Sequence, residues 1–259
     1  MRYLFFLLFI LPSLAVADEF YGVIYSDSKI EQSMEDSGTV KSIDIKIGQD
    51  VKAGEILVTL ESGMQELEQQ RNRLIWKDTR ELETQLRRLD ILRNKRDVAE
   101  SLYSQTRSIS RDELDSLSLE LIQVEGRIEQ IKEQKLRDEI EYHLSSLRLQ
   151  KRQLRAAFDG TVISLTAKQG EWVKAGDPIL GLVNADNLYI NLNVPDIFAR
   201  RLSLNSSVPI SVQNVSAVHG RVDFISPVAD AASGLVEIRI KLKNENKQIR
   251  PGAKAMVTL

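Results

Sequence analysis

The chain has 259 residues, and 35 Lys and Arg against 37 Asp and Glu leave a formal net charge of −2. Proteins that bind nucleic acid carry a basic footprint, so this balance argues against that class and no nucleic-acid partner is expected. The absence of cysteine excludes disulfides and thiolate metal sites. The length suffices for two small globular units together with an elongated helical segment.

Residues 1–17 are predicted to form a secretory signal segment. Arg2 supplies a positive start, Tyr3 to Leu11 an apolar stretch, and Ala15 to Ala17 the small residues typical of a cleavage site. The apolar stretch is short for a membrane span, which needs about 20 residues. We therefore expect cleavage after Ala17, with a retained N-terminal anchor as the alternative. Residues 20–24 follow as a candidate strand.

Two segments resemble each other at a constant offset of 122 residues (160 minus 38, 170 minus 48 and 176 minus 54). Each contains Gly-Thr-Val and then a Val-Lys-Ala-Gly stretch, which indicates one small β unit present twice. In the first copy, alternating apolar residues between Val40 and Ile47 predict a half-buried strand, and residues 56–60 predict a closing strand. Tight turns or close approaches are expected at the repeated glycines, which are Gly38, Gly48, Gly54, Gly160, Gly170 and Gly176.

The segment between the copies is predicted to be an antiparallel helical hairpin. It is rich in Leu, Glu, Gln, Arg and Lys, and only Gly126 interrupts it. Capping boxes are expected at Ser62 and at Ser110, so the first helix should stop near Ser108 and the second should start at Arg111. Each arm would have about 45 residues and measure roughly 65–70 Å at about 1.5 Å per residue.

Leucine-rich rows predict that the two arms pair along an apolar seam, while their charged faces remain in water. On the second arm the seam residues are Leu114, Leu117, Leu121, Val124, Ile128 and Ile131, continued after a shift of phase by Ile140, Leu144, Leu147 and Leu154. On the first arm they are Leu67, Leu74, Leu82, Leu86, Leu89 and Tyr103.

The last part of the chain, residues 185–259, changes to a period of two, which predicts a small β-barrel or sandwich. A short helix is expected over residues 197–202, across one opening of the barrel. The alternating apolar residues are Leu188, Ile190, Leu192, Val194, Val208, Ile210, Val212, Val236, Ile238, Ile240, Leu242, Ala255, Val257 and Leu259.

Two half-motifs flanking a helical insertion resemble a lipoyl/biotinyl domain split by a hairpin. This arrangement is similar to the periplasmic adaptor subunits, or membrane fusion proteins, of bacterial tripartite efflux and secretion systems. The resemblance implies a mainly elongated α+β fold with a split lipoyl-like β domain, an inserted antiparallel coiled-coil hairpin and a small β-barrel. The implied divisions are a signal segment at 1–17, the first lipoyl half at 18–62, the hairpin at 63–157, the second lipoyl half at 158–184 and the barrel at 185–259.

The resemblance also implies a function without catalysis. Such adaptors link an inner-membrane transporter to an outer-membrane channel, assemble as ring-like homo-oligomers, and lie in the periplasm at the inner membrane. An RND-type efflux pump is the favoured partner, and the alternatives are an ABC-exporter (type I secretion) adaptor or a free periplasmic coiled-coil scaffold. Many efflux adaptors carry a further membrane-proximal domain after the barrel, whereas this chain is expected to end with the barrel strand. The turn from Glu61 to Met64 lacks the lysine that lipoyl carriers modify, so no covalent cofactor is expected.

The hairpin tip is the implied contact with the outer-membrane channel. In the efflux branch an Arg and a Leu, eleven and seven residues before a Ser, make this contact. With Ser110 as that Ser, the other two positions are Ala99 and Tyr103, so only the Ser matches. Ser110 is also the predicted helix cap. The predicted contact residues are Tyr103, Arg107, Ser108, Ile109, Ser110 and Arg111.

The residue pattern does not predict a catalytic centre or a metal site. Glu139 and His143 are four residues apart on one arm, a spacing that can present two metal ligands on one face. An ordinary ion pair on a solvated helix is the favoured interpretation. We therefore expect no enzymatic activity, cofactor or metal.

Overall fold

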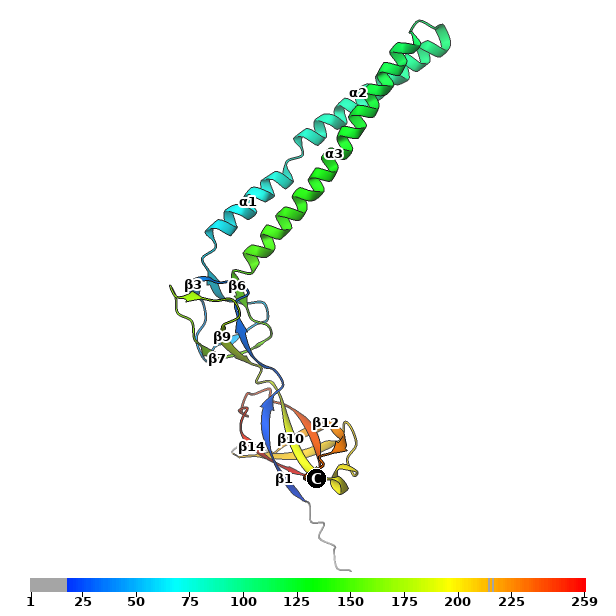
Figure 1. Ribbon diagram of the computed structural model, residues 1–259. Helices are drawn as coiled ribbons and strands as arrows, with labels where there is room; N and C mark the ends of the chain where they lie inside the picture. Colours follow the sequence, from blue (N-terminus) through cyan, green and yellow to red (C-terminus); the bar gives the residue numbers. More distant parts are fainter. Residues whose placement is uncertain (1–17, 214, 216) are drawn as a thin grey trace, which may run out of the picture.

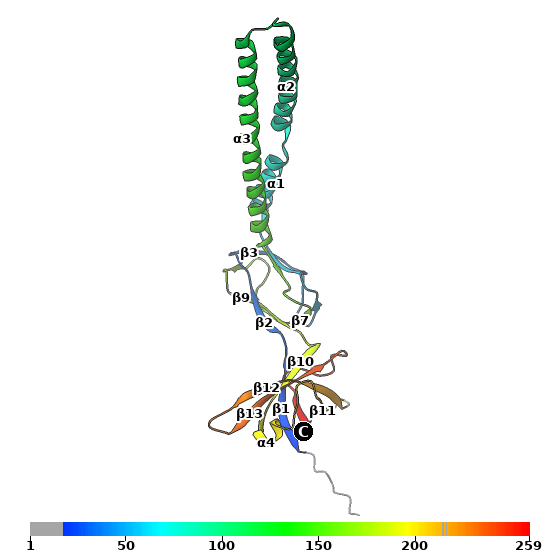
Figure 2. The ribbon, with the colours of Figure 1, turned by 90° about the vertical axis from the view of Figure 1, so that its right-hand side faces the viewer.

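The computed structural model describes residues 18–213, 215 and 217–259. The predicted signal segment lies outside these residues. Three parts follow one another along an elongated molecule, with a β-barrel at one end, a β unit in the middle and a helical hairpin at the other end (Figures 1 and 2). The hairpin projects from the β unit on the side away from the barrel.

The barrel is closed by antiparallel neighbours in the order β1-β10-β13-β12-β11-β14. Successive residues of each strand point alternately into the barrel and out of it, so every second residue forms the core. Ile190 and Ile238 point inward and are fully buried, whereas their neighbours Tyr189 and Glu237 are not. The predicted strand at residues 20–24 is confirmed and longer, and the expected helix is shorter, ending at Ala199. The elements are β1 (Glu19–Ser26), β10 (Asn187–Pro195), α4 (Asp196–Ala199), β11 (Ser207–Val212), β12 (Val218–Ala229), β13 (Leu235–Lys243) and β14 (Lys254–Thr258).

The sequence pattern did not predict β12, although this is the longest barrel strand described. Its pairing with β13 is interrupted by irregularities between Val222 and Phe224 and between Ile225 and Ala229. The first irregularity places one extra residue on β12 relative to β13 and the second places two, so a regular period of two is not visible over the whole strand.

The middle β unit consists of two sheets, in the orders β2-β9-β7-β4 and β6-β5-β3-β8. The internal repeat is confirmed, since β3, β4 and β5 begin 122 residues before β7, β8 and β9 (160 minus 38, 172 minus 50, 178 minus 56). The two copies exchange short strands, because β4 pairs with β7 and β8 pairs with β3. The bounds are β2 (Lys29–Ser33), β3 (Gly38–Ile43), β4 (Asp50–Val51), β5 (Ile56–Leu60), β6 (Gln153–Arg155), β7 (Gly160–Leu165), β8 (Trp172–Val173) and β9 (Pro178–Val183).

The hairpin consists of α1 (Gly63–Lys77), α2 (Arg80–Thr106) and α3 (Arg111–Gln150). The prediction of two unbroken arms is wrong for the first arm, which is interrupted at residues 78–79. The stop after Thr106 and the restart at Arg111 are confirmed. The capping box at Ser62 is wrong as well. In the described chain the Ser62 side chain makes no capping bond, and its hydroxyl donates instead to Glu66 Oε1 at 2.6 Å.

The interruption divides the hairpin into two halves. We call α2 with residues 111–131 of α3 the outer half, and α1 with residues 132–150 of α3 the root half. The predicted seam is confirmed in the outer half, where Leu89, Leu121, Val124 and Ile128 are buried. In the root half the prediction is wrong, and the wrongly placed seam residues are exposed: Leu67, Leu74, Ile140, Leu144 and Leu147. Leu86, on the outer half, is also exposed, and Leu154 is buried but lies in β6, not in the hairpin.

Nowhere in the described chain is a helix long and apolar enough to span a membrane. The boundary predicted at residue 157, between the hairpin and the second half of the β unit, stays a prediction. The helix itself ends at Gln150 and is followed by β6.

Candidate functional site

The tip of the hairpin is a short loop between α2 and α3, the position at which the predicted channel contact lies (Figure 1). Arg107 ends α2 in the left-handed conformation, with φ 52° and ψ 25°. This conformation terminates helices because it turns the chain away from the helix axis. The Thr106 hydroxyl donates to the Leu102 carbonyl at 2.8 Å and lies 2.6 Å from the Ser108 hydroxyl, which holds the loop compact.

Ser110 is the N-cap of α3. Its backbone is extended, with φ −77° and ψ 155°, and its Oγ accepts a hydrogen bond from the Glu113 N–H at 3.2 Å. Asp112 and Glu113 in the first turn add negative charge where the helix dipole is positive. This part of the capping prediction is confirmed.

The predicted contact residues differ in how far they are available to a partner. Arg107, Ser108, Ser110 and Arg111 are exposed, whereas Tyr103 and Ile109 are half-buried. The structure therefore brings two arginines and two serines to the surface of one loop. Whether these side chains bind a channel stays a prediction.

The position of the family's Arg is occupied here by Ala99, which is only 4% exposed because it packs in the α2–α3 interface. The nearby Arg96 is bound to Asp97, with Nη2 2.6 Å from Oδ1. This interaction raises the pKa of Arg96 above its ordinary value. The exposed arginines of the tip are Arg107 and Arg111.

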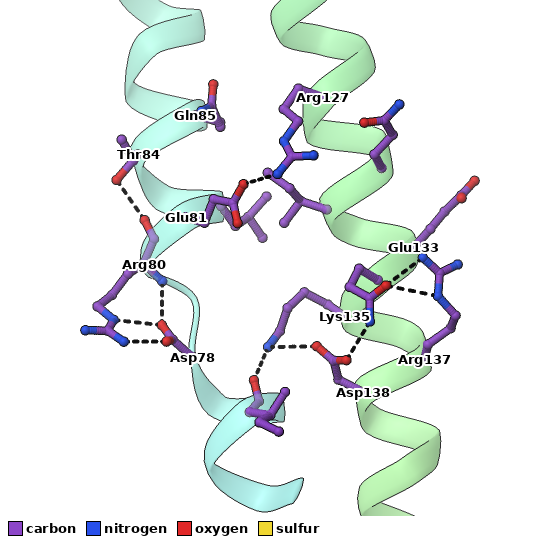
Figure 3. Close-up of a pocket in the computed structure, with 15 residues that line it drawn as sticks. Asp78, Arg80, Glu81, Thr84, Gln85, Arg127, Glu133, Lys135, Arg137 and Asp138 are labelled. Atoms are coloured by element: carbon purple, nitrogen blue, oxygen red, sulfur yellow. Dashed lines mark hydrogen bonds and ion pairs between the residues drawn. The ribbon is translucent and has the colours of Figure 1, made fainter.

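The break in the first arm is a second feature of the hairpin, and the sequence pattern missed it. Asp78 Oδ1 accepts from Arg80 N–H and Nε at 3.2 and 2.9 Å, and Arg80 Nη2 lies 2.5 Å from Oδ2 (Figure 3). The side-chain hydrogen bond from Arg80 is the main reason that the pKa of Asp78 lies well below its ordinary value. Asp78 and Thr79 are residue types that favour helix starts, and this signal could have revealed the break.

Charged side chains of α3 face the break (Figure 3). Lys135 Nζ donates at 2.6 Å to the Ile75 carbonyl in the last turn of α1 and lies 3.7 Å from Asp138 Oδ2. The same carbonyl accepts from the Asp78 N–H at 3.3 Å. Beyond the break, Arg127 forms an ion pair with Glu81. The helix interruption is thus held by α3 on both of its sides.

The hairpin is attached to the β unit through the residues that follow α3. Arg152 Nη1 donates to the Ser37 carbonyl at 2.9 Å, and its Nε lies 3.7 Å from Asp36 Oδ2. Lys151 Nζ lies 3.1 Å from Glu35 Oε2. These contacts fix the direction of the hairpin at its base.

The repeated turns of the β unit are related by the same offset. The Ala53 N–H donates to Asp159 Oδ1 at 2.8 Å, and the Ala175 N–H donates to Ser37 Oγ at 2.9 Å. The hydrogen bond from the Ala53 N–H is the larger cause that lowers the pKa of Asp159. The second cause is Lys52, whose Nζ lies 3.1 Å from Asp159 Oδ2.

The glycines of these turns fall into two groups. Gly48, Gly54, Gly170 and Gly176 have φ between 81° and 88°, a region that residues with a Cβ rarely adopt. At Gly160 a Cβ would lie 2.6 Å from the Val183 carbonyl oxygen, and at Gly38 it would lie 2.8 Å from Arg152 Nη1.

One ion pair connects the β unit with the barrel. Lys247 Nζ lies 2.6 Å from Asp50 Oδ2, and the Thr161 hydroxyl donates to Asp50 Oδ1 at 2.5 Å. The Lys247 hydrogen bond is the larger reason that the pKa of Asp50 is lowered, followed by that of Thr161. Neither residue was predicted as part of a site, because the contact joins positions that are far apart in the sequence.

Glu139 and His143, the two residues whose spacing could have suited a metal ion, have the geometry of an ordinary helix ion pair. His143 Nε2 lies 3.8 Å from Glu139 Oε1. The residues that the structure describes contain no group of three or more His, Cys, Asp and Glu able to hold a metal ion.

Comparison with known families covers nearly all of the described chain. Residues 33–184 match the family described as CzcB-like, barrel-sandwich hybrid domain, and residues 187–259 match the family described as CusB-like, beta-barrel domain.

Individual relatives are more distant. The chain is 26% identical over 219 residues to nodulation protein NolF of Rhizobium meliloti (strain 1021), which covers 83% of this chain and 56% of NolF. It is 26% identical over 218 residues to cobalt-zinc-cadmium resistance protein CzcB of Cupriavidus metallidurans, which covers 83% of this chain and 39% of CzcB. The chain thus spans about half or less of the length of these relatives.

Solved structures share the fold. The crystal structure of MacA from Actinobacillus actinomycetemcomitans has a TM-score of 0.65 at 20% identity and covers 93% of this chain and 78% of that one. The membrane fusion protein Spr0693 from Streptococcus pneumoniae R6 has a TM-score of 0.61 at 12% identity and covers 93% and 98%. With the matched families, these results show that the chain belongs to the CzcB-like barrel-sandwich hybrid family of membrane fusion proteins, the periplasmic adaptors that its sequence resembles.

Proposed function

We propose that this chain is a non-enzymatic periplasmic adaptor that links an inner-membrane transporter to an outer-membrane channel. The observation that carries the proposal is the long hairpin held at its base by a β unit of the adaptor family, with the barrel at the opposite end (Figure 1). This arrangement separates two candidate contact regions by the full length of the molecule. An adaptor needs such a separation, whereas an enzyme or a carrier domain does not.

An RND-type efflux pump is the favoured transporter. The relatives with this arrangement include proteins named for cobalt-zinc-cadmium resistance and for cation efflux. The ABC-exporter adaptor and the free periplasmic scaffold, which the sequence left open, have no comparable support. The substrate is left open, because an adaptor need not bind it specifically.

The mechanism is mechanical and steric. The tip loop contacts the channel, the β unit fixes the base of the hairpin, and the barrel docks on the transporter. Several copies form a ring around the exported substrate, because one rod cannot enclose a conduit. The predicted signal segment brings the chain to the periplasm, where it works at the inner membrane.

The test of this function is capture of the tagged full chain from crosslinked cell envelopes, followed by mass spectrometry. We expect recovery of a polytopic pump together with an outer-membrane channel. Recovery of neither, with folded chain in the capture, would contradict the adaptor function and favour a free scaffold.

A tip variant tests the channel contact separately. Arg107→Glu with Arg111→Glu reverses two exposed charges on the tip loop, so we expect loss of the channel from the capture while the pump is retained. Lys95→Glu, an exposed charge on the shaft of α2, is the matched control and should retain both. Retention of the channel by the double tip variant would show that these arginines do not make the contact.

A further inference from the structure

A cavity of about 750 Å³ lies in the wall of the barrel, between strands β12 and β13. The register pairs Arg221 of β12 with Lys241 of β13, and the pairing of these two strands begins at this position. The strand ends next to this pair, residues 219–220 of β12 and 242–243 of β13, line the cavity. Its volume falls in the range of about 300–1,000 Å³ that small-molecule sites usually have.

The cavity lies toward the end of the barrel that adjoins the β unit (Figures 1 and 2). Asp27, which follows β1, and Asn187, which begins β10, both belong to its lining. Ser207, at the start of β11, lines the other side. The neighbours β10, β13, β12 and β11 therefore all contribute to one concave surface.

Positive charge is concentrated in this lining. Arg221, Lys241 and Lys243 are exposed there, and Asp27 supplies one carboxylate among the described lining residues. The whole chain has a formal net charge of −2, so the cluster does not follow from a generally basic composition. A local excess of cations on an acidic protein favours an anionic ligand.

The positions of the cations are unfavourable for the barrel by itself. Arg221 and Lys241 stand directly opposite each other, and like charges in such cross-strand positions destabilise a sheet. Lys241 Nζ lies 3.1 Å from Asp223 Oδ1, whereas Arg221 and Lys243 have no ion-pair partner among the described residues. A bound anion would relieve the repulsion that the folded chain leaves in place.

Uncharged polar groups surround the cations. Ser207 is the cross-strand neighbour of Arg221 in the β11–β12 pair, and the side chains of Asn187 and Asn205 also line the cavity. The Asn205 N–H donates to the Val222 carbonyl at 2.7 Å, which fixes the segment that leads into β11. Hydroxyl and amide groups supply directional hydrogen bonds in addition to charge.

The charges are arranged with a positive and a negative end. In the strand order, Asp27 lies beyond β10, the lysines are on β13, and Arg221 is on β12. Arg binds phosphoryl oxygens through two parallel N–H bonds, and Lys adds a point charge. The Asp27 carboxylate repels a ligand that is anionic throughout, but it accepts hydrogen bonds from hydroxyl or ammonium groups.

We propose that this cavity binds a phosphate ester whose organic part carries hydroxyl or ammonium groups. The phosphoryl group contacts Arg221, Lys241 and Lys243, and Asp27 accepts a hydrogen bond from the organic part. A soluble phosphate ester and a phospholipid headgroup share this chemistry. The site goes beyond the adaptor function and does not depend on it.

The first test uses the purified full-length chain and glycerol 3-phosphate as the soluble probe, measured by isothermal titration calorimetry. Arg221→Gln with Lys243→Gln should raise the dissociation constant about tenfold or more. Arg250→Gln with Lys254→Gln changes an exposed Arg and an exposed Lys elsewhere on the barrel and should change it less than about twofold. Equal effects of the two double variants would overturn the proposal.

A second test addresses the organic part of the ligand. Inorganic phosphate lacks this part, so the wild-type chain should bind it more weakly than glycerol 3-phosphate. Asp27→Asn should reduce the difference between the two probes several-fold, because it removes the carboxylate that repels the ion and accepts from the glycerol hydroxyls. An unchanged difference would contradict the role of Asp27.

A third test distinguishes the two sources. Flotation with phosphatidylglycerol vesicles is compared with flotation with vesicles of a phosphorus-free galactolipid. A preference for phosphatidylglycerol that is lost in Arg221→Gln with Lys243→Gln identifies a lipid headgroup. Binding of glycerol 3-phosphate without such a preference identifies a soluble ester. Absence of both effects in folded wild-type chain would overturn the proposal.

The opposed charges give an independent measurement that needs no ligand. In phosphate-free buffer, Arg221→Gln removes the like-charge pair and should raise the thermal midpoint of unfolding by about 1–3 °C. Addition of glycerol 3-phosphate should raise the midpoint of the wild-type chain and leave that of Arg221→Gln with Lys243→Gln nearly unchanged. An unchanged or lower midpoint for Arg221→Gln would contradict the unrelieved repulsion on which the site is argued.

Discussion

The outer and root halves of the hairpin have similar helix-forming composition but place their aliphatic residues on different sides. In the outer half, Leu92, Val124 and Ile128 are 3–5% exposed between α2 and α3. In the root half, Asn72 and Ser145 occupy the interface, and the leucines face outward. The outer half therefore contains an aliphatic core, whereas the root half places Asn72, Ser145 and the stacked rings of Trp76 and Tyr142 between its helices.

The difference shows that an aliphatic row on a helix identifies a face to be covered but does not identify what covers it. The interruption at residues 78–79 lies at the point where one arrangement changes into the other (Figure 3). A break of this kind lets α1 and α2 present different faces to one continuous α3.

The largest expected effect is on the core of the outer half. Ile128→Ala removes a side chain that is 3% exposed and should lower the free energy of unfolding by about 2–5 kcal/mol. Ile140→Ala is the matched change in the root half and should stay within about 0.5 kcal/mol while the chain is monomeric. Denaturant unfolding at low protein concentration measures both. Similar losses would mean that Ile140 is buried within one copy.

The polar interior of the root half is tested by Asp138→Ala. This change removes the carboxylate beside Lys135, whose side chain is only 20% exposed, and should lower the free energy of unfolding by about 1–3 kcal/mol. Replacing both residues, with Lys135→Met and Asp138→Leu, should recover most of the loss because neither half-buried charge is then left without its partner. A double variant less stable than Asp138→Ala would contradict this account.

The helix caps give a smaller contrast. Ser110→Ala removes the hydrogen bond to the Glu113 N–H and should lower the free energy of unfolding by about 1 kcal/mol. Thr79→Ala, at the start of α2, should cost less, because the Thr79 hydroxyl donates to Glu83 Oε1 and, among the described residues, makes no capping bond. Thermal unfolding of the two variants measures both losses of stability. A larger loss for Thr79→Ala than for Ser110→Ala would contradict the assignment of Ser110 as the stronger cap.

The smallest effect is on titration at the break itself. The hydrogen bonds from Arg80 lower the pKa of Asp78, so the folded state holds this proton less tightly than the unfolded chain, whose Asp pKa is about 3.9. The resulting stabilisation is present above pH of about 4 and is lost as pH falls through the folded pKa. Arg80→Gln should move the Asp78 pKa back toward its ordinary value. An NMR titration of the Asp78 carboxyl that is unchanged by Arg80→Gln would exclude this cause.

Local patterns determined much of the fold. The offset of 122 residues predicted the two copies of the β unit, and alternation predicted the barrel residues from Leu188 to Val194 and from Val236 to Leu242, because strand periodicity is a property of neighbouring residues. The cap at Ser110 and the position of the tip were likewise visible, since capping depends on residues within one turn.

Tertiary structure alone decided the remaining features. The strand exchange between the two copies and the Asp50–Lys247 contact join residues that are distant in the sequence. The exposure of Leu67 and Leu147 was not predictable either, because a helical period shows that a face is aliphatic but not how far the helix is rotated against its partner. That rotation results from the packing of whole helices, and here it leaves Leu67 and Leu147 exposed on the surface of the hairpin.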